Sequence, residues 1–144
     1  AMVVAMERVR DAGLTNVRFL DRDAALLPEF FAHGEVSRIY INFPDPWPKK
    51  KQFKRRLTAP GFQKLYFDLL PPGGEVWLKT DNVMLYEWSL EQFQNCGWTL
   101  KEVTRDLHEH GIQGVMTDYE AKFHEQGVKI NRLVAVRGEV WPCE

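Results

Sequence analysis

The alternation of apolar and polar residues along the chain predicts five β-strands. The strongest pattern is VSRIYINF at residues 36–43, where β-branched and aromatic side chains accumulate just before a proline-rich stretch. The remaining predicted strands are shorter or more mixed in composition and cover residues 16–21, 75–80, 98–106 and 128–136.

Apolar residues at helical spacing predict five helices before and between these strands. The first covers residues 1–11, with apolar Val4, Met6 and Val9 and with Gly13 just after it. The other predicted helices cover residues 23–33, 59–70, 83–95 and 117–126, and PPGG at residues 71–74 predicts a tight turn.

Strands that alternate with helices favour a mainly parallel α/β sheet that helices cover on both faces. Because only a loop and a short helix connect the last two strands, these two could form an antiparallel pair at one edge. The 144 residues contain no repeat, linker or low-complexity stretch, so we expect a single domain over residues 1–144.

The composition narrows the class of protein. With 44% hydrophobic and 27% charged residues it is typical of a folded globular domain rather than of a disordered chain. No apolar run reaches the roughly 20 residues that a membrane-spanning helix needs, and no signal-peptide pattern opens the sequence. The two cysteines, Cys96 and Cys143, lack metal-ligand spacing, which predicts two reduced thiols in a cytoplasmic protein.

The net charge of −1 conceals one strongly basic segment, KKKQFKRR at residues 49–56. This segment holds six of the 19 basic residues and no acidic one, which leaves 13 basic against 20 acidic residues elsewhere. Cations at this density attract a phosphate backbone, and Phe53 adds a surface on which a base can stack. The alternative is a charged loop that faces only solvent.

Polar residues follow three of the predicted strands. Asp21 and Asp23 come after the first strand, Asp45 follows residues 36–43, and KTDN at residues 79–82 ends a third strand. In open α/β sheets, ligands bind beyond the carboxyl ends of the strands. These residues therefore predict a shared polar rim at that end of the sheet.

The segment NFPDPW at residues 42–47 is the strongest single signal of function. Proline on each side of Asp45 removes two backbone donors and is expected to hold Phe43 and Asp45 in extended geometry. The Asp45 carboxylate would then stand on a stiff loop near the indole of Trp47, which suits a planar or cationic ligand. Lys49 follows within reach of Asp45 or of a phosphate. The alternative is a rigid turn with a surface acid and a core tryptophan.

Other motifs carry weaker or negative information. Thr117 and Glu120 have the spacing of a helix capping box, so this segment has a purely structural alternative. His108 and His110 flank an acid, but no third ligand stands near them, which argues against a metal site. The sequence has no glycine-rich phosphate loop and no nucleophile elbow, so a phosphotransferase or an acyl hydrolase is unsupported.

Three motifs together resemble the bacterial tRNA (guanine-N7)-methyltransferases. They are FPDPWPKKKQFKRRL, GGEVWLKTDN and TDYEAKF, which stand in that family's order and spacing, and the similarity runs from about residue 1 to residue 136. The resemblance implies a class I methyltransferase fold, a Rossmann-like three-layer α/β sandwich. It also implies S-adenosylmethionine as the methyl donor and a guanine of the tRNA variable loop as the acceptor, with no membrane and no metal involved.

The same resemblance implies roles for individual residues. Asp23 and Asp45 would line the cofactor pocket, and Asp45 would also be the catalytic acid. The residues that would hold the substrate are Lys49, Asp81, Thr117, Asp118, Tyr119 and Glu120. The residues that would lie against RNA are Lys51, Gln52, Phe53, Lys54, Arg55 and Arg56.

One part of the family pattern has no counterpart in these 144 residues. Members of the family carry a glycine-rich strand-to-turn segment and a second strand that ends in an acid, both ahead of the matching region. We therefore expect the first strands of the sheet to be missing and the strand edges at residues 16–21 and 36–43 to be unpaired. We also expect residues 1–144 alone to bind the donor weakly or not at all and to be catalytically inactive. A non-catalytic RNA-binding α/β domain is the alternative function, and a methyltransferase of small molecules is a third.

Overall fold

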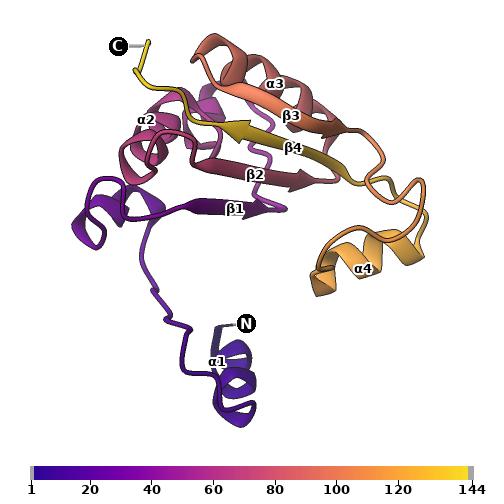
Figure 1. Cartoon of the computed structure of the whole chain (residues 1–144). Coiled ribbons are helices and arrows are strands. Elements are labelled where there is room, and N and C mark those ends of the chain that lie inside the picture. Colours follow the sequence, from indigo (N-terminus) through magenta and orange to yellow (C-terminus); the bar gives the residue numbers. More distant parts are fainter. Residues whose placement is uncertain (1, 143–144) are drawn as a thin grey trace.

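The computed structural model describes residues 2–142. Along the chain the elements are α1 (Met2–Asp11), η1 (Ala24–Glu29), β1 (Arg38–Asn42), η2 (Lys50–Arg55), α2 (Pro60–Leu69), β2 (Glu75–Thr80), α3 (Val83–Asn95), β3 (Thr99–Thr104), α4 (Asp118–Glu125) and β4 (Asn131–Val136), where η denotes a 3-10 helix. The strands form one sheet, α2 and α3 lie together on one side of it, and α4 lies beyond one end (Figure 1).

The sheet has the strand order β1-β2-β4-β3. β1 is parallel to β2, whereas β4 is antiparallel to both β2 and β3. The predicted antiparallel pairing of the last two strands is therefore confirmed. The prediction of a mainly parallel sheet is wrong for residues 2–142, because β4 enters between two strands that run the opposite way. Within the same residues β1 is an edge strand that pairs only with β2, as expected for residues 36–43.

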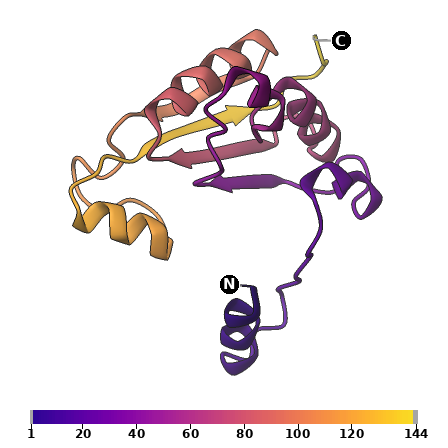
Figure 2. The same ribbon diagram turned by 180° about the vertical axis from the view of Figure 1, so that it is seen from behind.

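The core lies between one face of the sheet and the helices α2 and α3 (Figure 2). Residues of β2 alternate strictly in burial, so that Val76 and Leu78 are fully buried. Tyr66 and Phe67 come from α2, and Phe93 comes from α3. Complete burial of a large apolar side chain contributes roughly 1.5–3 kcal/mol, so this half of the molecule holds the chain's main source of stability.

Helix α3 has the bounds that the sequence predicts, because both of its ends are encoded locally. The side chain of Asn82 accepts a hydrogen bond from the backbone N–H of Leu85 (2.8 Å), which caps the first turn. Gly97 follows the helix with a φ of 77°, a left-handed conformation that favours glycine. Cys96, which lies between the end of α3 and Gly97, is buried in the core. Cys143 lies outside the described residues.

The other face of the sheet is largely open, which contradicts the prediction of helices on both faces. Tyr40 is 56% exposed there, and Trp77 beside it is half-buried. The guanidinium of Arg38 lies 4.8 Å from the Trp77 ring centroid and covers part of the indole. No helix of residues 2–142 lies on this face, so these residues form two of the three expected layers (Figures 1 and 2).

The N-terminal part departs most from the predictions. The first predicted helix is confirmed as α1, without Ala1, which lies outside the described residues; α1 buries no residue and stands apart from the sheet (Figure 1). Residues 16–21 form no strand, because no neighbouring strand in the described part of the chain hydrogen-bonds to them. The helix predicted at residues 23–33 is only η1, because Pro28 inside it lacks the N–H for an α-helical hydrogen bond.

Candidate active site

Three segments meet at the carboxyl ends of β1 and β2: the loop after β1, the turn after β2 and the start of α4. The loop extends the pairing of the two strands by one residue, because the backbone N–H of Phe43 donates to the carbonyl oxygen of Lys79 (2.8 Å). The ring of Phe43 also packs on α4, with its centroid 6.2 Å from that of Tyr119 and 5.6 Å from that of Phe123. The structure thus brings these segments together at the end of the sheet where ligands bind in this fold class.

The loop after β1 is constrained, but not in the predicted way. Phe43 has a φ of 50° and Trp47 a φ of 41°, a left-handed backbone region that residues with a side chain rarely adopt. The prediction that Phe43 is extended is therefore wrong. Its hydrogen bond to Lys79 and its ring contacts with α4 override the preference that the following proline imposes. Such strain, of order 1–3 kcal/mol per residue, persists where the surroundings over-determine the conformation.

The side chains of Asp23 and Asp45 line one open pocket of about 610 Å³. Asp23 is fixed as the cap of η1, because its Oδ1 accepts a hydrogen bond from the backbone N–H of Ala25 (2.8 Å). Trp47 and Arg55 belong to the same wall, with the guanidinium 5.2 Å from the indole centroid. The other lining residues are Ala24, Ala25, Lys54, Leu57 and Phe62. The two acids that the resemblance assigns to one pocket therefore do lie together.

Asp45 presents its carboxylate to solvent. The residue is exposed, and within residues 2–142 it takes part in no salt bridge. Lys49, which the sequence places within reach of it, is exposed at the start of η2, where its backbone N–H donates to Oε1 of Gln52 (3.3 Å). The Asp45 carboxylate is consequently accessible to a ligand that carries positive charge.

The basic segment at residues 49–56 divides into outward and inward side chains. Lys51, Lys54 and Arg55 are exposed, and Lys54 and Arg55 line the pocket. Gln52 and Phe53 are half-buried, since the Gln52 side chain caps η2 and the Phe53 ring lies 5.6 Å from that of Trp88. The outward cations form a surface that a phosphate backbone can reach.

Arg56 is the inward member of this segment. It is 2% exposed, and its Nε–H donates to the carbonyl oxygen of Pro46 (2.8 Å). Its guanidinium lies 3.8 Å from the ring centroid of Phe53 and 4.7 Å from that of Trp88. Burial lowers the pKa of Arg56 from its ordinary value, although an arginine stays charged at neutral pH. Arg56 therefore connects the end of η2 to the loop that carries Asp45 through its hydrogen bond to Pro46. Its side chain is buried, whereas a residue that contacts RNA would have to be exposed.

The segment TDYE at residues 117–120 begins α4. Oγ1 of Thr117 accepts a hydrogen bond from the backbone N–H of Glu120 (3.1 Å), so one half of the predicted capping box is present. The other half is absent, because the Glu120 side chain binds Lys79 and His108 instead. Asp118 is almost fully exposed and lies 3.5 Å from the guanidinium of Arg8, while Tyr119 is 66% exposed. Asp118 and Tyr119 are therefore accessible to a partner, whereas Glu120 is completely buried.

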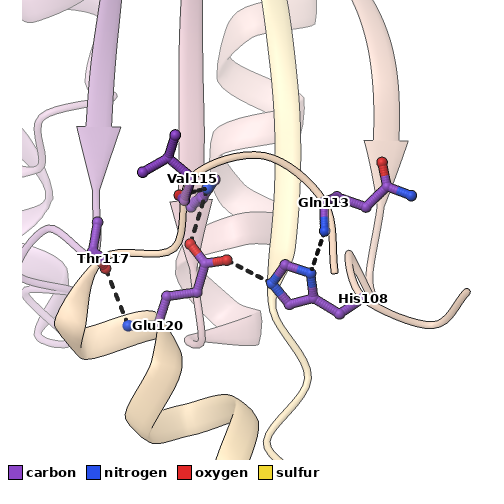
Figure 3. A network of polar contacts seen from close by, with 6 residues as sticks. His108, Gln113, Val115, Thr117 and Glu120 are labelled. Carbon is purple, nitrogen blue, oxygen red and sulfur yellow. Dashed lines mark hydrogen bonds and ion pairs between the residues drawn. The ribbon is translucent and has the colours of Figure 1, made fainter. Parts of the chain in front are cut away.

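Both carboxylate oxygens of Glu120 are bound within the protein (Figure 3). Oε1 accepts a hydrogen bond from Nζ of Lys79 (2.9 Å), and Oε2 lies 2.5 Å from Nε2 of His108. In this arrangement Glu120 cannot contact a substrate directly, in contrast to the role that the resemblance implies. The sequence places Lys79 in the polar rim at the end of β2 and argues against His108 as a metal ligand, but it does not predict that either residue binds Glu120.

Asp81 is half-buried in the turn between β2 and α3. Hydrogen bonds fix the turn on both sides of it: Oγ1 of Thr80 accepts from the backbone N–H of Asn82 (3.1 Å), and Nδ2 of Asn131 donates to the Thr80 carbonyl oxygen (3.0 Å). Asp81 therefore stands in a rigid turn at the same end of the sheet as the loop after β1.

Two further properties concern residues 2–142 alone. No group of three or more histidine, cysteine, aspartate or glutamate side chains in that range could hold a metal ion. No helix in the same range is both long enough and apolar enough to cross a membrane.

Comparison with known proteins identifies the family. A family model described as "Putative methyltransferase" matches residues 1–133. The chain belongs to this methyltransferase family. It is 47% identical over 132 residues to the tRNA (guanine-N(7)-)-methyltransferase of Streptococcus suis and 47% identical over 137 residues to that of Geobacillus kaustophilus. These matches cover 91% and 94% of this chain but only 62% and 63% of the relatives, so the chain spans less than two thirds of their length.

Solved structures, among them a methyltransferase, share the fold of this family member. TrmN from Thermus thermophilus has a TM-score of 0.60 at 30% identity, and the match covers 94% of this chain and 33% of that one. An SAM-dependent O-methyltransferase from Thermotoga maritima has a TM-score of 0.55 at 15% identity, over 95% of this chain and 46% of that one. The class I methyltransferase fold predicted from the sequence is thereby confirmed, with only part of each neighbour's chain represented.

Proposed function

We propose that this chain carries the catalytic loop and the tRNA-facing surface of a tRNA (guanine-N7)-methyltransferase. The reaction would transfer a methyl group from S-adenosylmethionine to N7 of a guanine in the tRNA variable loop, in the cytoplasm. The observation that carries the proposal is the placement of Asp45 on a strained loop, in one pocket with Asp23 and beside the exposed cations of η2. The names of the relatives from Streptococcus suis and Geobacillus kaustophilus support the same reaction.

The residues of the pocket suit the proposed donor in chemical type. S-adenosylmethionine supplies an electrophilic methyl group on a sulfonium ion. The carboxylates of Asp23 and Asp45 would attract its positive groups, and the rings of Trp47 and Phe62 offer surfaces for an adenine. A structure of the same fold, the geranyl diphosphate C-methyltransferase of Streptomyces coelicolor, contains S-adenosyl-L-homocysteine, which supports a donor of this kind.

The acceptor atom defines what the protein has to do. Guanine N7 has a lone pair and no proton, so its attack on a methyl group needs no general base. The protein must instead align the base, exclude water and balance the positive charge that appears on the methylated ring. We assign this orienting and charge-balancing role to the carboxylate of Asp45, which removes no proton.

The tRNA would lie across the end of the sheet. Lys51, Lys54 and Arg55 would contact phosphates, because all three cations are exposed and two of them, Lys54 and Arg55, line the pocket. The remaining residues with a proposed substrate role are Lys49, Asp81, Thr117, Asp118 and Tyr119, all at the same end of the sheet. Tyr119 is exposed and stacked on Phe43, so the pair offers a flat aromatic surface to an unstacked base.

A chimaera tests the proposed reaction. Residues 1–133 of this chain would replace the corresponding segment of the Streptococcus suis relative, and the chimaera would be incubated with labelled S-adenosylmethionine and tRNA. We expect label in 7-methylguanosine after nuclease digestion, and loss of that label in the Asp45→Asn chimaera. A chimaera that is folded and binds tRNA but labels no guanine would contradict the proposal and favour the alternative, a non-catalytic RNA-binding domain. Label on a free nucleoside but none on tRNA would favour a small-molecule methyltransferase.

We further propose that residues 1–144 alone bind S-adenosylmethionine weakly and do not turn over, while keeping salt-sensitive tRNA binding. The support is the openness of the pocket between η1 and the loop after β1, whose two acids are both exposed. A ligand of this size is held tightly only where most of its surface is buried. Calorimetry on the 144-residue chain is the test, and stoichiometric binding at micromolar affinity would refute it.

A further inference from the structure

A buried polar network joins three elements that are distant in the sequence. Lys79 comes from the end of β2, His108 from the loop after β3, and Glu120 from the first turn of α4. Their side chains are 12%, 3% and 0% exposed, respectively. Nζ of Lys79 also donates to the carbonyl oxygen of Val115 (3.2 Å), so the network includes the loop that precedes α4.

The hydrogen bonds determine which form of His108 the structure contains. Nδ1 accepts a hydrogen bond from the backbone N–H of Gln113 (3.1 Å), so Nδ1 carries no proton. The proton is therefore on Nε2, which donates it to Oε2 of Glu120 (2.5 Å). Glu120 is thus the single negative group between one cation, Lys79, and one neutral donor, His108, and both of its oxygens are satisfied (Figure 3).

This network is the main attachment of α4. The helix has eight residues and lies beyond the end of the sheet, so it cannot be held by packing on the core (Figure 1). Besides the network, α4 contacts Phe43 through Tyr119 and Phe123, and the ring of His124 lies 5.2 Å from that of His108. The ion pair of Asp118 with Arg8 is exposed to solvent. Removing Lys79 leaves the buried carboxylate without its countercharge, and removing His108 leaves Oε2 without a donor. In either case the helix and its preceding loop would have to move to resolvate Glu120.

We propose that Lys79 and His108 are positioning residues for tRNA binding that act through Glu120. They hold its carboxylate, and Glu120 in turn fixes Thr117, Asp118 and Tyr119 where the substrate meets α4. This assignment rests on the proposed function, and it replaces direct substrate contact by Glu120 with an indirect role. His108 and Lys79 therefore determine affinity for tRNA without touching it.

The test compares three variants of the 144-residue chain. His108→Leu removes the donor to Glu120 and the acceptor for Gln113, whereas His108→Gln keeps an amide that can donate to Glu120. His110→Ala is the control, since this histidine is in the same loop with a side chain that is 86% exposed. Amide hydrogen exchange at Gln113 and Glu120, thermal unfolding and tRNA affinity would be measured for each.

We expect His108→Leu to accelerate exchange at both amides and to weaken tRNA binding about tenfold at fixed salt, the effect of losing one hydrogen bond to a charged group. The dependence of log affinity on log salt should stay unchanged, because no phosphate contact is lost. His108→Gln should recover most of the affinity, and His110→Ala should match the wild type. A purely structural role would lower the melting temperature without changing the affinity of the folded fraction.

The outcomes separate this proposal from the proposed function. Unchanged exchange at Gln113 and Glu120 in His108→Leu would overturn it even if the wild type binds tRNA well. If the leucine variant does not fold, Lys79→Met provides the second test, with the same expected pattern of exchange and affinity. Accelerated exchange in a chain whose wild type binds no tRNA would reject the tRNA role together with the proposed function.

Discussion

Arg56→Met isolates what the inward arginine contributes to the loop that carries Asp45. Methionine keeps most of the aliphatic stem that fills the buried position, where Arg56 is 2% exposed. It removes the donor to the carbonyl oxygen of Pro46 and the cation between the rings of Phe53 and Trp88. Any loss of stability is therefore due to the polar and cation–π contacts rather than to a large cavity.

The size of the effect follows from those contacts. A hydrogen bond from a charged donor contributes about 1.5–3 kcal/mol, and a desolvated cation–π contact about 1–2 kcal/mol. The two ring contacts share one cation, and removing a buried charge recovers part of its desolvation cost, so the terms do not add. We expect Arg56→Met to lower the free energy of unfolding by about 2–3 kcal/mol. Arg55→Met, at an exposed guanidinium 5.2 Å from Trp47, should cost at most about 1 kcal/mol.

Urea unfolding and tRNA titration against salt give opposite rankings for the two variants. Arg56→Met should be the less stable one and should leave the salt dependence of tRNA binding as in the wild type. Arg55→Met should reduce the slope of log affinity against log salt by about one unit, as for one lost phosphate contact. If Arg56→Met were as stable as Arg55→Met, or reduced the salt slope equally, the inward assignment of Arg56 would be refuted.

Three further predictions concern the loop, the basic surface and the sheet. In the chimaera, Asp45→Asn should keep tRNA affinity but lower turnover about 100-fold or more, and near-normal turnover would exclude Asp45 from the mechanism. Exchanging Lys51, Lys54 and Arg55 for methionine should weaken binding to all tRNAs alike and reduce the dependence of log affinity on log salt. An unchanged dependence would show that these three side chains face only solvent and contact no phosphate. Glu75 has a lowered pKa, chiefly because Lys101 hydrogen-bonds to its carboxylate (2.6 Å), with Trp77 and Arg38 contributing. The Glu75 carboxylate therefore contributes its full stabilisation above about pH 4.5, and this stabilisation is lost as the pH falls through the lowered pKa. The free energy of unfolding of Glu75→Gln should consequently fall less steeply with decreasing pH than that of the wild type, as measured by circular dichroism.

The elements that the sequence predicts correctly are those whose ends are encoded locally. Asn82 and Gly97 mark the ends of α3 by side-chain capping and by a left-handed backbone, and Thr117 caps α4 in the same way. The prediction of a strand at residues 16–21 is wrong because a strand is not encoded by its local sequence alone. A strand exists only where a neighbour pairs with it, and the local pattern carries no information about the neighbour.

For the site, the sequence identifies which residues cluster but not which way they face. Asp23 and Asp45 are brought into one pocket, as the strand-end argument and the resemblance indicate. Glu120 and Arg56 belong to motifs that suggest contact with tRNA, yet both are buried. Whether a charged side chain points outward depends on partners such as His108 and Trp88, and no local pattern links those to it.

The two buried charges explain how the strained loop keeps its shape. Arg56 holds the carbonyl of Pro46 from the side of η2, while the backbone N–H of Phe43 is bound to Lys79, the same residue whose ammonium holds Glu120. Phe43 and Pro46 bracket the segment that presents Asp45, and each is fixed by a contact made outside the loop. The ammonium of Lys79 holds the first turn of α4 while its backbone carbonyl oxygen holds Phe43, so one residue of β2 contacts both segments. The loop that carries Asp45 and the start of α4 are thus linked through one residue at the end of β2.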